Sequence, residues 1–461
     1  MREEEGHTMK PCFYAKSPGN EGYIKNMEVL AFHGLDGWAI FQMALYRKEG
    51  RYYLYGAGRG NPVCPILDVT DPERPKLVER LCVAPDNPRQ KVGKIQAADG
   101  LLITALSCGA SASGAAGAYR PEQFGTGLSG FMIFDIASDP IHPRLLGCWK
   151  NGVSGGANGV HRFFYNGGSY VHVSSDCRGF EGMIYRIVDI RDPTAPREVG
   201  RWWLPEQFAD GYAGRTFDPC APHNPEYMKK GWLHGPPYVR DGRAYCGYAG
   251  AGLVVLDVRD VTRPKLLGRL PLSPPFSSYY AGAKTHTALP LPGRDFLVLT
   301  NEGERFSWFN AEKLGGMPQS LNNLHLVDIR DPSRPTLIAE FPYPEVPEGF
   351  PYPNFNEMGI GCPGPFGPHN IHEPMSNKPW LEQRGDRVYC CYFHAGLRVY
   401  DVSDPYYVKE IGYFIPPNPL RHRVSTNVGP CIGVSEDCVV DDRGVIFMDT
   451  YQDGLYVLRM Q

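Results

Sequence analysis

The sequence predicts an all-β fold, a seven-bladed β-propeller built from four-stranded blades. Three observations lead to this prediction. A motif of strand, Asp-Pro corner and strand returns six times, and tight hairpin signals precede its copies. The chain also combines 53 glycines and 43 prolines with 42% hydrophobic residues, which indicates many turns between short buried strands rather than helices or disorder. Repeated four-stranded units are the sequence signature of a propeller.

The repeat begins with an apolar run and then turns at an aspartate. The copies read ILDVTDPERPKLVERL (66–81), IFDIASDPIHPRLLGCW (133–149), IVDIRDPTAPREVGRW (187–202), VLDVRDVTRPKLLGRL (255–270), LVDIRDPSRPTLIAEF (326–341) and VYDVSDPYYVKEIGYF (399–414). The apolar run is typical of a buried strand. Proline lacks a backbone donor and fixes φ, so the chain must turn before the next strand departs.

A second hairpin is expected upstream of each copy. HRFFYNGGSYVHVSS (161–175) and PPYVRDGRAYCGY (236–248) carry the Asn-Gly and Asp-Gly corners that favour tight β-turns. Together with the repeat, this gives four strands per unit.

The two ends of the chain are expected to close the ring. GVIFMDTYQDGLYVLRMQ (444–461) is a strand pair without its Asp-Pro corner, and KNMEVLAFHGL (25–35) is an isolated outer strand. Joining them gives seven blades, with the N-terminal strand completing the last blade and leaving no exposed edge. We therefore expect one domain over 25–461, preceded by a flexible lead-in over 1–24. A string of separate domains would leave strands unpaired at both ends.

These corners resemble the LVIVD repeat, whose family members are taken to be β-propellers. The resemblance extends over nearly the whole chain. It implies the fold and assigns no activity.

The bulk properties restrict the partners and the compartment. A net charge of −3 argues against nucleic acid and anionic membranes. The N-terminus lacks the basic and apolar regions of a signal peptide, and no run of 18 apolar residues occurs. The 13 cysteines are scattered without a CxxC pair, which favours reduced thiols and a cytoplasmic protein.

The loops expected on one face of the ring are long and aromatic. They span 107–130, 204–232, 303–323 and 343–368, whereas the turns of the other face are short. Long loops gathered on one face usually carry function, and aromatic side chains suit the walls of a small-molecule pocket. The same loops would also suit packing on the ring or a homo-oligomer interface.

Four histidines occupy the same predicted position, at the start of the strand nearest the axis in four successive blades. They are His161, His234, His286 and His369. Each by itself is ordinary, but equivalent positions around a narrow axis converge. Imidazole is a common ligand for iron, zinc, manganese and copper, so we expect one divalent metal ion here, with Fe²⁺ favoured and Zn²⁺, Mn²⁺ or copper open. His372 is a fifth candidate, which strand alternation would turn away from the side used by His369.

Carboxylates are expected near these imidazoles. Glu302 and Glu304 follow a strand that returns to the long-loop face, Glu373 follows His372, and Asp176 ends a strand. Such groups orient metal-bound imidazoles, bind metal themselves or transfer protons. A surface role for a glutamate at a loop start is an equally ordinary interpretation.

Two further resemblances bear on this site. Four histidines from four blades resemble the iron centre of carotenoid-cleavage oxygenases, in which glutamates hold the imidazoles. The segment THTALPLPGRDFLVLTNEGE (285–304) is similar to a hairpin of the selenium-binding protein (methanethiol oxidase) family. The first resemblance implies an iron centre, and both imply a His-rich propeller.

The predicted function is therefore a metal-dependent enzyme acting on a small aromatic or unsaturated substrate, most simply by oxidative cleavage or oxygenation. A metal-assisted lyase, hydratase or hydrolase with a glutamate as the proton-transfer group is the alternative. A non-catalytic interaction scaffold is the second alternative. The sequence has no Walker A motif and no GxSxG elbow.

Overall fold

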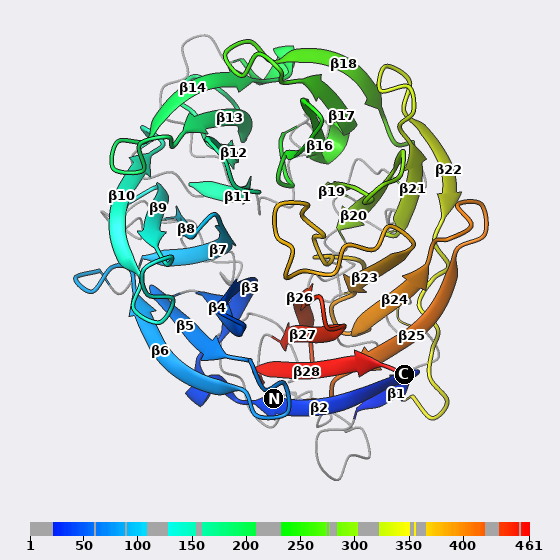
Figure 1. Ribbon diagram of the computed structural model, residues 1–461. Coiled ribbons are helices and arrows are strands. Elements are labelled where there is room, and N and C mark those ends of the chain that lie inside the picture. Colours follow the sequence, from blue (N-terminus) through cyan, green and yellow to red (C-terminus); the bar gives the residue numbers. More distant parts are fainter. Residues whose placement is uncertain are drawn as a thin grey trace, which may run out of the picture.

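The computed structural model describes residues 22–59, 61–87, 90–107, 128–153, 159–208, 232–273, 276, 284–302, 322–350, 355, 366–419, 433–450 and 453–461. In these residues, seven four-stranded antiparallel sheets surround a central axis (Figure 1). The predicted seven-bladed propeller is confirmed. Within the described residues, three short 3₁₀ helices lie in the connections, at Leu35–Gly37, Pro205–Gln207 and Ala249–Ala251.

We number the blades in chain order, with the strand nearest the axis first. Blade 1 is β3 (Ile40–Lys48), β4 (Arg51–Gly58), β5 (Val63–Asp68) and β6 (Lys76–Cys82). Blade 2 is β7 (Lys91–Ala98), β8 (Leu101–Ser107), β9 (Gly130–Asp135) and β10 (Arg144–Lys150). Blade 3 is β11 (Val160–Phe164), β12 (Tyr170–Ser175), β13 (Ile184–Asp189) and β14 (Arg197–Trp202). Blade 4 is β15 (Tyr238–Arg240), β16 (Arg243–Tyr248), β17 (Gly252–Asp257) and β18 (Lys265–Leu270).

The remaining blades include the N-terminal strands. Blade 5 is β19 (Lys284–Pro290), β20 (Phe296–Glu302), β21 (Leu324–Asp328) and β22 (Thr336–Glu340). Blade 6 is β23 (Arg387–Cys391), β24 (Leu397–Asp401), β25 (Lys409–Ile415) and, at its outer edge, β1 (Tyr23–Lys25). Blade 7 is β26 (Ser435–Val440), β27 (Val445–Thr450), β28 (Leu455–Met460) and β2 (Met27–His33).

The repeated aspartate makes the same turn in all six copies. Its Oδ1 accepts the backbone N–H of the residue two positions on, at 2.8 to 3.0 Å, in Asp68, Asp135, Asp189, Asp257, Asp328 and Asp401. This is the Asx turn, in which a side chain replaces a backbone acceptor. The aspartate therefore ends the third strand of a blade and starts the corner that leads to the fourth.

The N-terminal segment closes the ring by joining two blades. β2 pairs with β28, as predicted, and β1 pairs with β25 of the neighbouring blade (Figure 1). The strand β1 was not predicted. It contains Tyr23 and Ile24, the last two residues of the expected lead-in, while residues 1–21 lie outside the described part of the chain.

Blade 6 differs from the others at the axis. In place of a regular inner strand, the segment at His369–His372 pairs with β23 through a few backbone hydrogen bonds, including His369 N to Cys391 O and His372 N to Tyr389 O. The chain then continues as a segment over 373–383 instead of turning directly into β23. We call residues 373–383 the axial segment.

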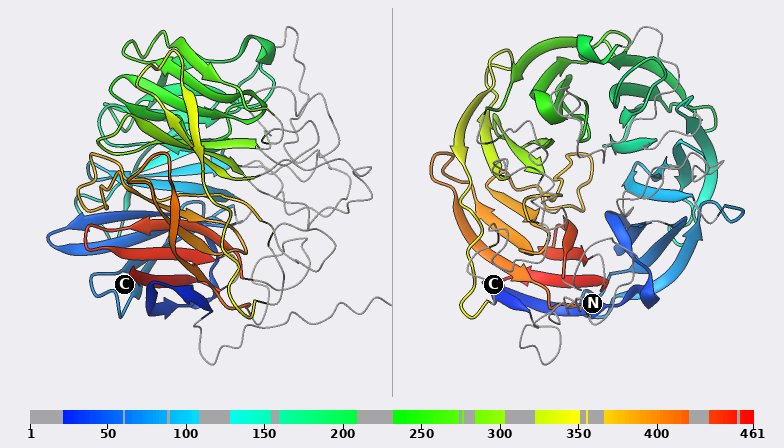
Figure 2. Two further views of the ribbon diagram at one scale, coloured as in Figure 1. Left: turned by 90° about the vertical axis from the view of Figure 1, so that its right-hand side faces the viewer. Right: turned by 180° about the vertical axis from the view of Figure 1, so that it is seen from behind.

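The axial segment crosses the centre of the ring in both face-on views (Figures 1 and 2). Its contacts reach several blades: Asn377 donates to Asp99 between β7 and β8, Ser376 accepts from Asn166 between β11 and β12, and the Trp380 indole donates to Leu45 O of β3. Because these partners lie at or toward the short turns, the segment covers the axis on the face opposite the predicted long loops. The sequence did not predict this feature.

The blades pack on one another through apolar side chains. Val171 and Val173 of β12, for example, lie in one buried cluster with Ile103 and Phe131 of blade 2. The eight cysteines in the described residues are all free thiols, and six of them are buried. None of the helices in the described residues is long and apolar enough to cross a membrane.

Candidate metal centre

Backbone bulges shape the inner wall of the channel. The register between the two innermost strands shifts at Ile40/Met43, Val92/Lys94, Val160/Arg162, Thr285/Ala288 and Ser435/Cys438, which is the same region of five different blades. A β-bulge places an extra residue on one strand and re-aims its side chains. Successive residues such as His161 and Arg162 can therefore both contribute to the channel, where a regular strand would turn one of them away.

The four predicted histidines lie next to one another in a continuous run. Ring centroids are 5.2 Å apart for His161 and His234, 4.6 Å for His234 and His286, and 5.1 Å for His286 and His369. His234, His286 and His369 are buried, whereas His161 is half-buried. The ring geometry thus brings together side chains that are as much as 208 residues apart, as between His161 and His369.

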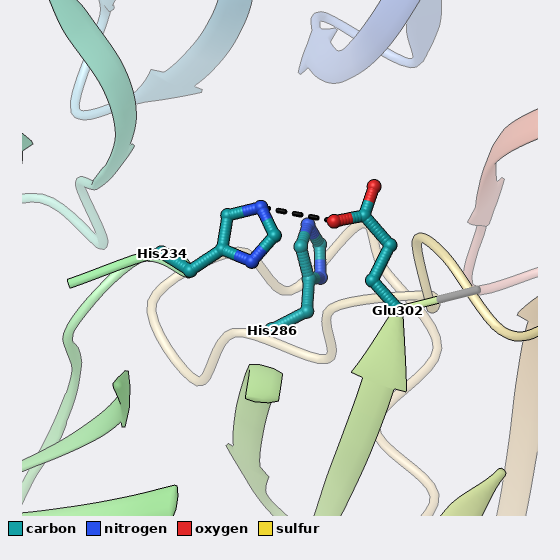
Figure 3. Close-up of side chains that lie close together, drawn as sticks. All are labelled: His234, His286 and Glu302. Carbon is teal, nitrogen blue, oxygen red and sulfur yellow. Dashed lines mark ion pairs between the residues drawn. The ribbon is translucent and has the colours of Figure 1, made fainter. Parts of the chain in front are cut away.

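A narrower group within this run has the spacing of metal ligands. One ligand atom from each of His234, His286 and Glu302 lies within 4.8 Å of the other two (Figure 3). Glu302 is the last residue of β20, and its Oε2 is 2.9 Å from His234 Nε2. Its second oxygen, Oε1, is 3.5 Å from His369 Nε2. Glu302 therefore lies between two imidazoles rather than behind one.

A glycine allows this close approach. Gly235 follows His234 directly, and a Cβ at this position would lie 1.6 Å from the backbone oxygen of His286. Any larger residue would push β19 away from the chain at His234. The glycine therefore keeps the backbone that carries His234 in contact with β19.

Hydrogen bonds fix which nitrogens carry protons. His369 Nδ1 is 3.0 Å from the carbonyl oxygen of Glu436, and a carbonyl only accepts, so Nδ1 donates and Nε2 keeps its lone pair toward Glu302. Arg162 donates to His286 Nε2 at 2.7 Å, so that nitrogen also carries a lone pair. His286 Nδ1 is 2.8 Å from the Thr287 hydroxyl. A partner that fixes the tautomer is a regular feature of metal-binding histidines.

The electrostatic environment keeps these imidazoles neutral. Burial lowers the pKa of His286 well below its usual value, and the positive charge of Arg162 lowers it further. Burial likewise lowers the pKa of His369, with Lys94 and Arg162 as the next contributions. Neutral imidazole is the form that binds a metal ion.

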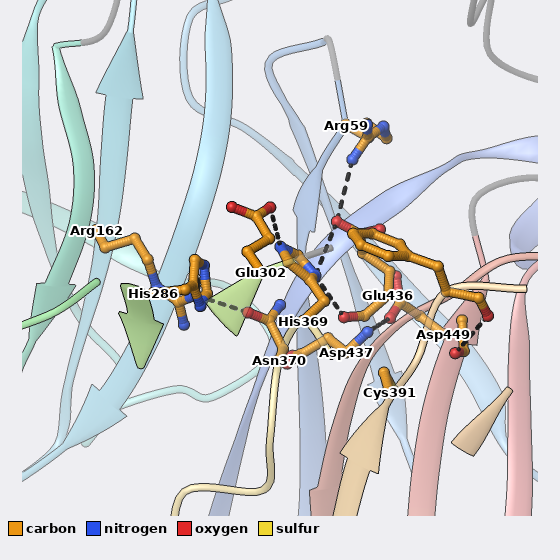
Figure 4. Close-up of polar contacts among 12 residues, drawn as sticks. Arg59, Arg162, His286, Glu302, His369, Asn370, Cys391, Glu436, Asp437 and Asp449 are labelled. Atoms are coloured by element: carbon orange, nitrogen blue, oxygen red, sulfur yellow. Dashed lines mark hydrogen bonds and ion pairs between the residues drawn. The ribbon is translucent and has the colours of Figure 1, made fainter. Parts of the chain in front are cut away.

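Arg162 is a buried cation beside the site (Figure 4). Besides His286, its Nη1 donates to Asn370 Oδ1 at 2.7 Å, and its Nη2 is 3.5 Å from Glu373 Oε1. An ion that takes the Nε2 lone pair of His286 must replace the Arg162 contact. Arg162 therefore occupies the His286 lone pair when no metal ion is bound, and it would compete with an incoming ion. The sequence did not predict this role of Arg162.

The other predicted site residues occupy different places. Glu373 lies 3.5 Å from Arg162, and its carboxylate accepts hydrogen bonds from the Tyr238 hydroxyl at 2.5 Å and from Gln96 at 3.2 Å. Asp176 Oδ2 accepts the backbone N–H of Gly159, just before β11. Glu304 lies outside the described residues.

His372 is separate from the run of four histidines. Its Nε2 is 3.0 Å from Glu382 O, and its Nδ1 accepts the backbone N–H of Val440 at 3.1 Å. Both ring nitrogens thus bind backbone groups, so it is His369 that faces the cluster.

Glu436 and Asp437 of blade 7 add buried acidic groups that sequence analysis also missed. Glu436 Oε1 is 3.4 Å from both His369 Nδ1 and Arg59 Nη1 (Figure 4). Asp437 Oδ2 accepts the Met43 N–H, and burial raises the pKa of Asp437 to about 7. The adjacent acids Glu436 and Asp437 are visible in the sequence GVSEDCVV (433–440). Only the bulge at Ser435/Cys438 allows the side chains of both to lie near the axis.

The comparisons with known proteins agree with the repeat. A model of the LVIVD repeat matches residues 320–341, which confirms that the chain carries this repeat. No curated protein matches the sequence.

Among solved structures, the Swd1 β-propeller domain from Myceliophteria thermophila has 10% identity and a TM-score of 0.49, over 98% of this chain and 99% of that one. A hypothetical selenium-binding protein from Sulfolobus tokodaii has 12% identity and a TM-score of 0.47, over 95% and 84%. A periplasmic gluconolactonase from Pseudomonas aeruginosa has 10% identity and a TM-score of 0.48, over 89% and 99%. Likenesses at this level assign no activity.

Proposed function

We propose that this protein is a metal-dependent enzyme that holds one divalent ion with His234, His286 and Glu302 and acts on a small organic molecule in the central channel. The observation that supports this proposal most directly is the spacing of the three ligand atoms, all within 4.8 Å of one another. The three residues come from two neighbouring blades and are all buried. His369, on the second oxygen of Glu302, is the nearest additional ligand.

The donor set suits two classes of metal. Two imidazoles and one carboxylate with open positions are typical of non-haem Fe²⁺ oxygenases, and the same three groups hold catalytic Zn²⁺ in hydrolases. We favour Fe²⁺ and oxidative cleavage or oxygenation of an aromatic or unsaturated substrate. The ion would supply Lewis acidity and, for iron, activation of dioxygen.

The residues of the chain have defined roles in this proposal. His286 and His369 stay neutral because they are buried near Arg162 and Lys94. The Nε2 lone pair of His369 points toward Glu302, and that of His286 becomes available to an ion when Arg162 moves away. Glu302 supplies the single negative charge of the ligand group. Phe393 stacks on His369 with ring centroids 4.9 Å apart and holds that imidazole in place.

The position of the axial segment determines the side from which a substrate would enter. It covers the axis at the short-turn face, so a substrate would enter from the face of the predicted long loops. Those loops lie mostly outside the described residues. A homo-oligomer through that face and a cytoplasmic location stay predictions.

Metal analysis and reconstitution test the proposal. Purified protein should bind one Fe²⁺ or Zn²⁺ per chain, and the iron form should consume dioxygen with a member of a panel of phenolic and unsaturated compounds. Turnover by the zinc form alone would instead support the hydrolase or lyase alternative. A protein that binds no stoichiometric metal would be the predicted scaffold, and the proposal would be wrong.

A further inference from the structure

Lys94 is a buried amine on the innermost strand of blade 2, and it is not one of the proposed metal ligands. It lies on β7 at the bulge Val92/Lys94, and its side chain is almost completely covered, with 2% of the residue exposed. The ammonium nitrogen is 3.5 Å from the centroid of the Phe41 ring. In the part of the chain that the structure describes, no hydrogen bond or ion pair joins this nitrogen to a partner.

This environment is costly for a lysine that only supports the fold. A buried charge is normally paired or hydrogen-bonded, because removing it from water without compensation is strongly unfavourable. Lys378 is the useful comparison, since it is similarly buried but lies in the axial segment near Glu373, beside a cavity of about 30 Å³. Lys94 instead lies on the innermost strand of blade 2, where charged side chains of blades 3, 5 and 7 act on it.

The charges around Lys94 come from three strands of other blades. Arg162 on β11 disfavours the protonated form, whereas Glu436 and Asp437 on β26 and Glu302 on β20 favour it. Burial is the largest contribution, and the balance lowers the pKa of Lys94 to about 7. A lysine that is desolvated and lies near another cation is the usual form of an amine nucleophile.

We infer that Lys94 is a nucleophilic amine that condenses with a carbonyl compound, an aldehyde or a 2-oxo acid, bound in the channel. The Nζ lone pair forms a bond to the carbonyl carbon while the C=O π electrons move to oxygen. The oxygen takes up the proton that nitrogen loses, which gives a carbinolamine. Loss of water then leaves the imine, so that amine and carbonyl are converted to imine and water with no oxidant or reductant.

The inference does not depend on the proposed metal. It deepens the chemistry of the same channel, because a carbonyl substrate suits both an amine nucleophile and a neighbouring Lewis acid. Its test is therefore carried out on metal-free, full-length protein, so that the two proposals can fail separately.

The experiment is competitive reductive methylation at pH 6.5 with limiting formaldehyde and a borane reductant, read by peptide mass spectrometry. About a quarter of a lysine with a pKa near 7 is neutral at this pH, against about one in ten thousand for an ordinary lysine. Even with restricted access, Lys94 should be modified at least about tenfold faster than the exposed Lys76 and Lys265, and its rate should rise with a midpoint near pH 7.

Two further measurements sharpen the result. Pyruvate with cyanoborohydride should attach a carboxyethyl group at Lys94 in preference to Lys378, which has similar burial but lies in the axial segment near Glu373. Glu302→Gln should increase the labelling of Lys94 at pH 6.5, since it removes a negative charge that favours the protonated amine. The inference is wrong if Lys94 is modified no faster than Lys76, or if pyruvate modifies Lys378 and spares Lys94.

Discussion

Glu302→Gln is the substitution that tests the metal centre without disturbing the fold. Glutamine keeps the size of the side chain and its ability to hydrogen-bond His234, but it removes the negative charge shared by His234 and His369. We expect the variant to fold, because the replacement opens no cavity. Its metal affinity should fall by about a hundredfold or more, since this is already the upper range for residues that only support ligands.

The size of the effect on stability can be worked out. A metal at 100 times its Kd stabilises the native state by about 2.7 kcal/mol. Unfolding of a 461-residue chain carries an entropy of about 1 kcal/mol/K, at about 2.1 cal/mol/K per residue. The wild-type Tm should therefore rise by about 3 °C, and that of Glu302→Gln by about 0.4 °C at the same metal concentration.

Differential scanning calorimetry with and without metal measures both shifts. Glu410→Gln is the matched control, because the Glu410 side chain is 7% exposed against 6% for Glu302, and it pairs with Arg398 in blade 6 at 3.1 Å. The control should lose stability in the metal-free form and keep the full metal-induced shift. An undiminished shift in Glu302→Gln would refute the assignment of this ligand.

Three other outcomes follow from the structure. Burial lowers the pKa of His172 to about 3 and that of His325 to about 4, so each is protonated more easily in the unfolded chain. The contribution of each histidine to the free energy of unfolding is therefore complete above about pH 7 and declines as the pH falls toward 4, by about 2 kcal/mol per histidine at pH 5. Urea unfolding that showed no such decline would contradict this prediction. Gly235→Ala places a Cβ against His286 O, so it should lower the free energy of unfolding by about 3 kcal/mol or more and also abolish metal binding. Gly93→Ala, which has nothing within 4 Å of the added Cβ, should bind metal normally in a calorimetric titration. Deleting residues 1–33 removes β1 and β2 and should lower the Tm by about 5 °C or more relative to deletion of 1–21; equal melting temperatures would show that the N-terminal strands do not close the ring.

The carboxylates show where sequence reasoning reached its limit. Glu302 was predicted near His286, because both lie at the same end of one hairpin. Its place between His234 of blade 4 and His369 of blade 6 depends on how neighbouring blades pack and twist, and no local pattern encodes that. Asp176 was predicted by the same argument, yet its carboxylate binds the backbone of Gly159.

Strict alternation along a strand would turn Arg162 away from the side used by His161, and Asp437 away from the side used by Glu436. The bulges at the inner strands break this period, so that Arg162 reaches His286. A bulge leaves no clear mark in a single sequence, because many residue types can occupy it.

The sequence by itself determined the ring. Each Asp-Pro corner is a local event, since the aspartate caps its own turn and proline ends its own ladder, and six copies with two complementary ends leave few other ways to pair the strands. The same periodicity placed four histidines at equivalent positions. Only the tertiary structure decided what those histidines face, namely the carboxylate of Glu302 and the guanidinium of Arg162. It also decided that the amine of Lys94 is buried near them and that the axial segment covers the opposite end of the axis. These groups come from different blades, and their meeting is set by side-chain packing around the axis rather than by any pattern along the chain.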